Sequence, residues 1–329
     1  MKKFLALILG CLIVFSGVSC TDKTEEKTYK LGVVDGAPTL AVANVLSEGF
    51  TFRSGSEKYV VEVDLVGSAQ NISAGLISGE YDMAIAPLNL ASTIYNNKSE
   101  LGIRLASVNI FGCLYAIGGE VAEDMSAYKG KTVISVGAGG TPDVIFRNLL
   151  ITNGIGVNGE DENDPEKVTI TYAQNAAGVI AAFNKNEADY AVLGEPAVTT
   201  VCNKLGKVVA MDIQSEWKKT YENSNFVQAG LFLAGEAAEN SDFIEAFINK
   251  LSGNAKFLEE NIDKLNEIFL KAESSLKDTA FTPELISRCN VGCKKAKEVK
   301  PDVETFLSAL YGFNPAQIGG KLPGDDFYL

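Results

Sequence analysis

The chain has 329 residues, of which 46% are hydrophobic and 22% charged, so it is long enough to bury one large core or two smaller ones. Its formal net charge of −13 argues against nucleic acid as a partner, because no basic stripe is available to neutralise phosphates. Histidine is absent, which removes the commonest general base and metal ligand and makes an enzyme a less favoured class.

The N-terminus has the pattern of an export signal. Two lysines precede an apolar stretch from Phe4 to Phe15, and small residues then lead to Cys20. This order resembles a bacterial lipoprotein signal, which implies that residues 1–19 are removed and that Cys20 carries the lipid. An ordinary secretory peptide and an N-terminal membrane anchor are the alternatives. The residues that follow are polar and charged, so we expect residues 20–28 to form the lipidated cysteine and a flexible tether.

Strands and helices alternate in the next part of the chain. The pattern predicts strands at 29–34, 59–66 and 81–86 and helices at 40–50, 72–78 and from 88 onward. Such alternation indicates a parallel sheet with helices on its faces, and ligands bind these sheets beyond the carboxyl ends of the strands. The turns after the three strands are therefore candidate binding segments, although any turn from strand to helix has a similar composition. The candidate residues are Gly36, Ala37, Pro38, Thr39, Ser68, Asn71, Pro87 and Asn89.

A second candidate segment begins at the strand predicted for residues 132–136. This strand ends in a glycine turn that contains Gly139 and Gly140. Thr141 stands at the expected N-cap of the following helix, which Gly154 closes. The free N–H groups at the start of this helix could receive an anionic or carbonyl group, whereas a tight turn without a ligand is the alternative.

Two further patterns divide the chain into lobes. The long apolar stretch 101–119 predicts a strand that leaves one sheet and enters a second, and residues 225–234 predict a strand that returns. Residues 186–196 repeat the layout of residues 79–87, in which the end of a helix is followed by an acidic, tyrosine-containing strand and a proline. Further strands are expected at 168–173, 188–193 and 207–212, with helices at 175–184, 197–204 and throughout 242–310.

Four cysteines remain beyond the expected cleavage site. Cys289 and Cys293 lie four residues apart, and either a disulfide or two separate buried thiols fits this spacing in an exported protein. No second pair stands at zinc-ligand spacing, so we expect neither a metal site nor a cofactor.

Together these segments resemble the extracytoplasmic substrate-binding proteins of ABC importers, in particular the branch that includes the sulfonate, nitrate and thiamine-precursor binders. The resemblance rests on the segments LGVVDGAPTLAVA, GEYDMAIAPLNLA, GAGGTPD and NEADYAVLGEPA. It implies the two-lobed type II periplasmic-binding-protein fold, an α/β fold whose lobes are mixed sheets flanked by helices. Residues 29–111 and 206–329 would form lobe 1, and residues 112–205 would form lobe 2.

The resemblance also implies capture of a small solute in the cleft between the lobes. We expect a monomer held by its lipid on the extracytoplasmic face of the membrane, where ABC permease and ATPase subunits would be its partners. Glu195 would contribute to the cleft by accepting a ligand N–H, or it would be a helix N-terminal acid. Arg147 and Arg288 could pair with an anion, although each is more often solvated or structural.

Two other functions stay open on the sequence. An enzyme on the same fold, of the menaquinone-pathway type, is disfavoured by the signal peptide and by the lack of a nucleophile–base pair. A surface receptor or adhesion lipoprotein that kept the fold without transport is the other. The sequence favours an anionic or heterocyclic solute, but no contiguous motif distinguishes a sulfonate, nitrate or a pyrimidine precursor.

Overall fold

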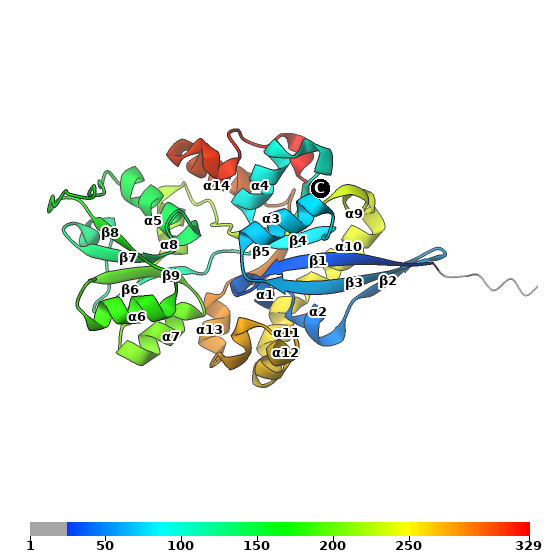
Figure 1. The fold of residues 1–329 in the computed structure, drawn as a ribbon, viewed down its shortest axis with the longest axis horizontal. Coiled ribbons are helices and arrows are strands. Elements are labelled where there is room, and N and C mark those ends of the chain that lie inside the picture. The colour runs from blue at the N-terminus through cyan, green and yellow to red at the C-terminus, as the bar shows by residue number, and fades with distance from the viewer. Residues whose placement is uncertain (1–24) are drawn as a thin grey trace, which may run out of the picture.

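The chain forms two lobes, which Figure 1 shows in green on the left and mainly in blue to red on the right. The computed structural model describes residues 25–329, so the expected signal peptide and Cys20 lie outside the described residues. Each lobe is a mixed sheet covered by helices, with seven strands in lobe 1 and five in lobe 2. The predicted two-lobed α/β architecture is confirmed. Among residues 25–329, none of the helices combines the length and apolar character that a membrane span needs.

The sheet of lobe 1 has the strand order β12-β5-β11-β4-β1-β3-β2. β1 pairs in parallel with β3 and β4, whereas β11 runs antiparallel between β4 and β5. The strands are β1 (Glu25–Val34), β2 (Thr51–Ser54), β3 (Glu57–Val66), β4 (Met83–Pro87), β5 (Arg104–Ile110), β11 (Ala229–Leu233) and β12 (Val291–Lys295).

The sheet of lobe 2 has the order β10-β6-β9-β7-β8. β7 pairs in parallel with β8 and β9, and β6 runs antiparallel between β9 and β10. The strands are β6 (Leu114–Gly118), β7 (Thr132–Val136), β8 (Thr169–Ala173), β9 (Tyr190–Gly194) and β10 (Val208–Asp212).

Both sheets follow the same plan, which accounts for the internal repeat seen in the sequence. In each lobe a strand that arrives from the other lobe, β11 or β6, lies antiparallel beside the third parallel strand, β4 or β9. The repeated acidic residue occupies the same place in both. Asp82 accepts the backbone N–H of Lys30 at 2.8 Å in lobe 1, and Asp189 accepts that of Thr132 at 2.9 Å in lobe 2. Each carboxylate therefore ties the start of the third strand to the first.

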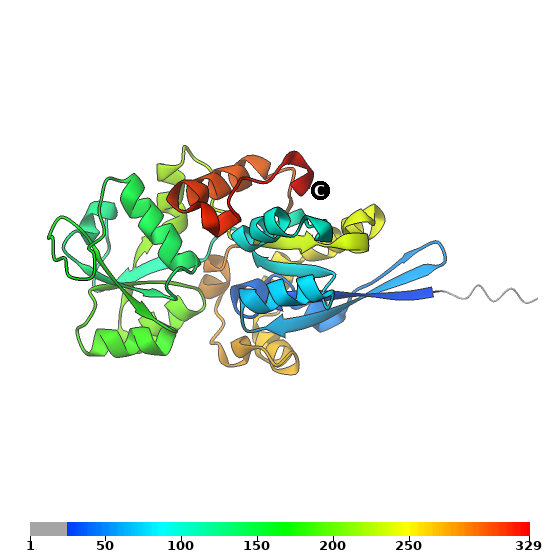
Figure 2. The same ribbon diagram turned by 45° about the horizontal axis from the view of Figure 1, so that its top comes forward.

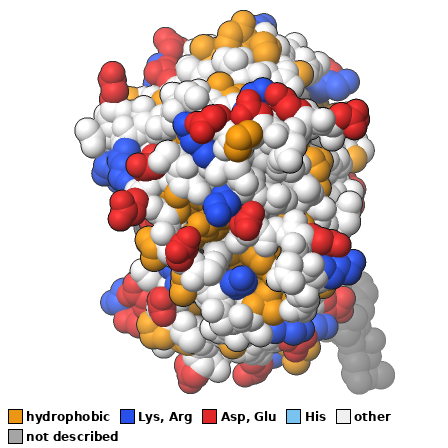
Figure 3. All heavy atoms as spheres, turned by 90° about the vertical axis from the view of Figure 1, so that its left-hand side faces the viewer, with side chains coloured by type: hydrophobic (Ala, Val, Ile, Leu, Met, Phe, Trp, Pro, Cys, Tyr) orange, Lys and Arg blue, Asp and Glu red, His pale blue; other side chains and the backbone are white. Residues whose placement is uncertain are grey.

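The helices cover both sheets. Lobe 2 carries α5 (Thr141–Thr152), α6 (Ala176–Asn184), α7 (Ala197–Leu205) and α8 (Ile213–Thr220). Lobe 1 carries α1 (Ala37–Leu40), α2 (Ala43–Glu48), α3 (Ala69–Ser78), α4 (Leu88–Asn97), α9 (Gly235–Glu239), α10 (Ser241–Ser252), α11 (Asn254–Glu260), α12 (Leu265–Lys271), α13 (Pro283–Arg288) and α14 (Lys300–Phe313). Short 3₁₀ turns lie at Ser99–Leu101, Met125–Tyr128, Ile262–Lys264, Ser275–Asp278, Pro315–Ile318 and Asp325–Phe327. On the end of lobe 2 that points away from lobe 1, acidic and basic side chains are interspersed (Figure 3).

Two crossing segments, residues 111–113 and 221–228, connect the lobes, and α14 lies across the same junction (Figures 1 and 2). An aromatic cluster fills the space beneath this helix. Trp217 of α8, Phe226 of the second crossing segment and Phe306 of α14 pack with ring centroids 5.2 to 5.8 Å apart. Apolar packing therefore continues from one lobe into the other.

Several boundaries differ from the sequence-based expectations. Residues 25–28, expected in the tether, pair with β3 as part of β1. β10 joins the sheet of lobe 2 through β6, although residues from 206 onward were expected in lobe 1. The helix expected at 40–50 is two short helices, and β12 lies within the region expected to be wholly helical. The half-buried, polar sequence VGCKK of β12 has none of the apolar alternation that marks a strand.

The start of α5 corrects the predicted cap. Gly140 is the N-cap and Thr141 is already helical. The Asp143 carboxylate, in the first turn, accepts the N–H of Gly139 at 2.8 Å. The carboxylate therefore closes the turn before the helix, and no side chain caps the first N–H groups of α5, so the Thr141 hydroxyl is not the cap.

The paired aspartates give a stability prediction. We expect Asp82→Ala and Asp189→Ala each to lower the free energy of unfolding by about 1 kcal/mol, because each loses a hydrogen bond that joins two strands. Urea unfolding followed by circular dichroism measures this. The exposed neighbour Glu80→Ala is the matched control and should change the stability little; equal losses in all three variants would contradict the role of the aspartates.

Candidate functional site

The carboxyl ends of the parallel strands of the two lobes face each other. At the end of β4, Pro87 pairs with Ala229, which also pairs with Ile110 at the end of β5. The chain then passes directly to Leu114, which pairs with Gly194 at the end of β9. The strand ends that carry the predicted turns therefore lie on either side of the junction, as expected for a site between two lobes.

In lobe 1 the turn after β1 is held by the side chain of Asp35. Its carboxylate accepts hydrogen bonds from Ser274 Oγ at 2.5 Å, the N–H of Ser275 at 2.7 Å and Thr39 Oγ1 at 3.1 Å. Burial alone would raise the pKa of Asp35, but the hydrogen bonds from these neighbours outweigh it and hold the pKa below its ordinary value. Asp35 is therefore ionised, and no lysine or arginine within residues 25–329 is among its hydrogen-bond partners.

The predicted residues of these lobe 1 turns are largely occupied in local contacts. Thr39 is fully buried, and its hydroxyl accepts the N–H of Gly36 at 3.2 Å, where φ is 125°. Ser68 caps α3 by accepting the N–H of Asn71 at 3.3 Å. Asn89 donates to the carbonyl of Gln317 at 3.4 Å.

In lobe 2 the glycine turn is closed by Asp143, which is 4% exposed. One oxygen accepts the N–H of Gly139, and the other pairs with Arg147 Nε at 2.8 Å. Arg147 also donates to the hydroxyl of Tyr172 at 2.6 Å. The N–H of Gly139 in this turn thus already faces a carboxylate of the chain itself.

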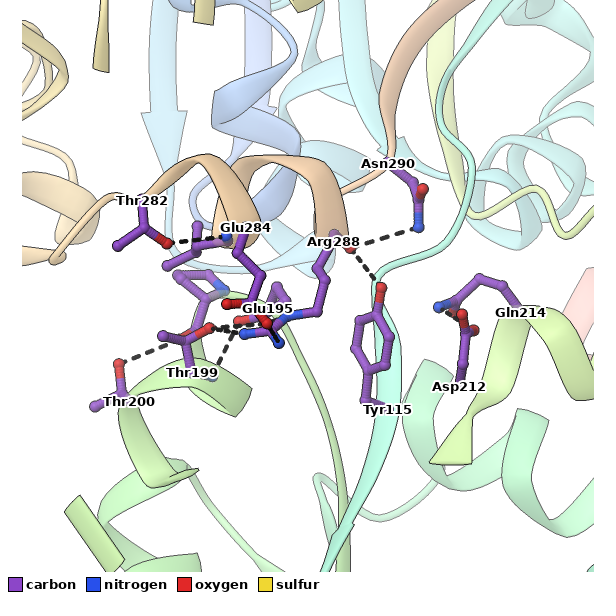
Figure 4. Close-up of polar contacts among 12 residues, drawn as sticks. Tyr115, Glu195, Thr199, Thr200, Asp212, Gln214, Thr282, Glu284, Arg288 and Asn290 are labelled. Atoms are coloured by element: carbon purple, nitrogen blue, oxygen red, sulfur yellow. Dashed lines mark hydrogen bonds and ion pairs between the residues drawn. The ribbon is translucent and has the colours of Figure 1, made fainter. Parts of the chain in front are cut away.

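Glu195 and Arg288 form an ion pair between the lobes (Figure 4). The Glu195 side chain, after β9, is fully buried, and its Oε1 lies 2.7 Å from Nε of Arg288 at the end of α13. Glu195 also accepts the N–H and the hydroxyl of Thr199 in the first turn of α7, at 3.0 and 2.8 Å. Arg288 donates further to Thr199 Oγ1 and to the exposed Glu284, each at 2.7 Å. The geometry shows Glu195 as a helix N-terminal acid, and its role toward a ligand stays a prediction.

Polar side chains also fix the first crossing segment. Gln228 and Gln214 accept the N–H groups of Cys113 and Leu114 at 3.0 and 2.9 Å. Tyr115 of β6 donates to the carbonyl of Arg288 at 2.9 Å (Figure 4). Asn290 donates to the carbonyl of Gly112 at 2.7 Å. Side chains from both lobes therefore satisfy this stretch of backbone, which anchors the connection between the sheets.

Two cavities lie at the junction. A cavity of about 10 Å³, the size of a single water, is lined by Asn89, Thr141 and Gln317 with apolar side chains of α5 and α14. A larger one of about 390 Å³ lies beside the crossing segments, where Asp212, Lys218 and Lys294 are among its lining residues. Of the predicted site residues, the structure brings Asn89 and Thr141 together at one cavity.

The described cysteines are free thiols. Cys289 is buried and Cys293 is partly buried, and no disulfide joins them. Burial raises the pKa of Cys113 to about 12 and raises that of Cys289 well above its usual range. Within residues 25–329 no group of three or more carboxylate or thiol side chains is arranged to hold a metal ion.

The ion pair between Glu195 and Arg288 is the functional feature that the sequence does not reveal. The two residues are 93 positions apart, and Arg288 lies on a short helix with no motif. The only local signal is that Glu195 follows the apolar run 190–193 after a single glycine. That run predicts burial of the carboxylate but says nothing about its partner.

Comparison with solved structures identifies the fold. An ABC transporter protein from Parabacteroides distasonis has a TM-score of 0.74 at 23% identity, over 92% of this chain and 98% of that one. The periplasmic aliphatic sulphonate binding protein SsuA from Escherichia coli has a TM-score of 0.64 at 13% identity, over 91% and 90%. The product of the Candida albicans gene CA3427, which has the generic periplasmic-binding-protein fold, has a TM-score of 0.53 at 12% identity, over 92% and 93%. No protein-family model and no curated protein matches the sequence. At these identities the comparisons show that the chain has the periplasmic-binding-protein fold, as the resemblance predicted.

The ion pair between the lobes predicts unequal effects of removing its two acids. Glu195→Ala should lower the free energy of unfolding by about 3 kcal/mol, because it leaves a partly buried guanidinium without its buried partner. Glu284→Ala removes an exposed partner of the same arginine and should cost less than about 0.5 kcal/mol. Chemical denaturation of both variants measures the difference; similar values would show that Glu195 contributes no more than a surface charge.

Proposed function

We propose that this protein is the substrate-binding component of an ABC importer, which captures a small solute between its lobes and delivers it to a permease. One observation carries the proposal. The two lobes share one topology and are joined by two crossing segments, and the carboxyl ends of their parallel strands face each other. Such an arrangement encloses a solute by a hinge motion and presents backbone and small polar groups to it from both sides. The fold, shared with ABC transporter and sulphonate-binding proteins, supports the proposal.

The proposal includes the location of the protein and of its site. Cys20 would carry the lipid that holds a monomer on the extracytoplasmic face of the membrane. The ligand would contact the turns that contain Gly36, Ala37, Pro38, Thr39, Ser68, Asn71, Pro87, Asn89, Gly139, Gly140, Thr141 and Glu195. Because the Asn89 and Thr141 cavity holds only about 10 Å³, a solute larger than water would enter that part of the junction only after the lobes separate.

No catalytic role is proposed. A reaction on this fold would need a nucleophile beside a base or a pair of carboxylates around a substrate. The carboxylates at the strand ends are instead held in hydrogen bonds and ion pairs with the chain.

Native mass spectrometry of residues 21–329, purified without denaturation, tests the proposal. We expect a retained small molecule, or a melting temperature that rises with the concentration of one member of a solute panel, as mass action requires. Asn89→Ala should reduce that rise, whereas Asn249→Ala, on the exposed surface of α10, should leave it unchanged. An empty protein that no solute stabilises would reject the importer role and favour a receptor or adhesion protein.

A further inference from the structure

The six turns at the facing strand ends have an unusual charge composition. They comprise residues 35–41, 67–71, 87–90, 137–143, 174–177 and 194–199, all within the described chain. These turns contain three carboxylates, Asp35, Asp143 and Glu195, and neither lysine nor arginine. An anionic solute held at these turns would therefore meet negative side chains without a cation from the turns themselves. Lys218 and Lys294 line the separate cavity beside the crossing segments, which contains no residue of the six turns.

The arginines that reach these turns are already neutralised. Arg147 pairs with Asp143, and Arg288 pairs with both Glu195 and Glu284. Each guanidinium is also hydrogen-bonded to a hydroxyl, Tyr172 for Arg147 and Thr199 for Arg288. An anion could bind either arginine only by displacing the carboxylate that is already paired with it. For Arg288 this would leave the fully buried Glu195 carboxylate without its counter-charge, which costs free energy.

The N-termini of the helices in these turns also provide few free donors for an anion. Proteins can bind anions through free N–H groups at helix N-termini, without any cation. In four of the turns, however, a side-chain oxygen of the chain already accepts such an N–H. The pairs are Gly36 with Thr39, Asn71 with Ser68, Gly178 with Asn175 and Thr199 with Glu195. In the glycine turn before α5, Asp143 accepts the N–H of Gly139. A carboxylate therefore lies at the start of both α5 and α7, so these two helix dipoles already face a negative charge.

We infer that the solute recognised between the lobes carries no net negative charge, so it is an uncharged or amine-bearing molecule rather than a sulfonate or nitrate. This inference rests on the proposed function and refines its ligand class. Asp35, whose hydrogen-bond partners are all uncharged, leaves a negative charge at the lobe 1 edge that suits an ammonium group. On this inference the solute differs from the sulphonate named for a structural neighbour.

The test uses residues 21–329 and matched solutes. Alkanesulfonates are compared with the alcohols and primary amines of the same alkyl chain in thermal-shift titrations, and any molecule retained after purification is identified by native mass spectrometry. We expect no saturable shift with a sulfonate and a retained or stabilising solute without net negative charge. Glu195→Gln, which frees Arg288 from its buried partner, should give ethanesulfonate a saturable thermal shift that the wild type lacks.

Two further variants keep the test interpretable. Glu284→Gln removes the exposed partner of the same arginine and should leave ethanesulfonate binding as in the wild type. Asp143→Asn removes the negative charge from the glycine turn and should have the same effect on ethanesulfonate binding as Glu195→Gln. It replaces Glu195→Gln in the test if Glu195→Gln fails to fold. Saturable binding of a sulfonate to the wild type, or a retained anion, would overturn the inference while the importer role stands. If no solute of any charge binds, the proposed function fails and this inference fails with it.

Discussion

The structure depends on a fully buried carboxylate whose counter-charge comes from the other lobe. Burial of the ionised Glu195 side chain costs free energy, and the nearby guanidinium of Arg288 and the donors of Thr199 offset that cost. The position of α13 against lobe 2 follows from this requirement. So does the position of Tyr115, which donates to the carbonyl of the same arginine. Separation of the lobes would leave Glu195 with Thr199 alone, so the ion pair favours the closed arrangement.

The antiparallel strands β6 and β11 determine where this ion pair forms. Each enters its sheet from the other lobe beside the third parallel strand, and the carboxyl ends of β4 and β9 therefore point toward each other. Because both lobes have this topology, residues 79–87 and 186–196 share the same layout of helix end, acidic strand and proline. Asp82 and Asp189 repeat a single structural role in the two lobes. Similar topology in the two lobes thus brings strand-end residues of both lobes, such as Asn89 and Thr141, to one junction.

Local sequence patterns predicted much of the fold, because most core strands have their own apolar run and most of the turns after them contain a glycine or proline. The strand at Thr132–Val136 and the crossing near residue 111 needed only such signals. β12 and the partner of Glu195 needed information from distant parts of the chain. A polar edge strand has no period to detect, and a charge pair between residues 93 positions apart has no spacing to recognise. For the candidate site, the sequence located the turns, but it could not show that several of their N–H donors are satisfied by the chain's own side chains.

The central claim is that the ion pair between Glu195 and Arg288 holds the two lobes together at their facing strand ends. Double electron–electron resonance between spin labels on exposed helix positions, one in α10 and one in α6, measures the distance between the lobes directly. The account predicts a single narrow distribution in the wild type and a shift to longer, broader distances in Glu195→Gln. Superimposable distributions in the two proteins would contradict it, because the arrangement of the lobes would then be independent of the buried charge pair.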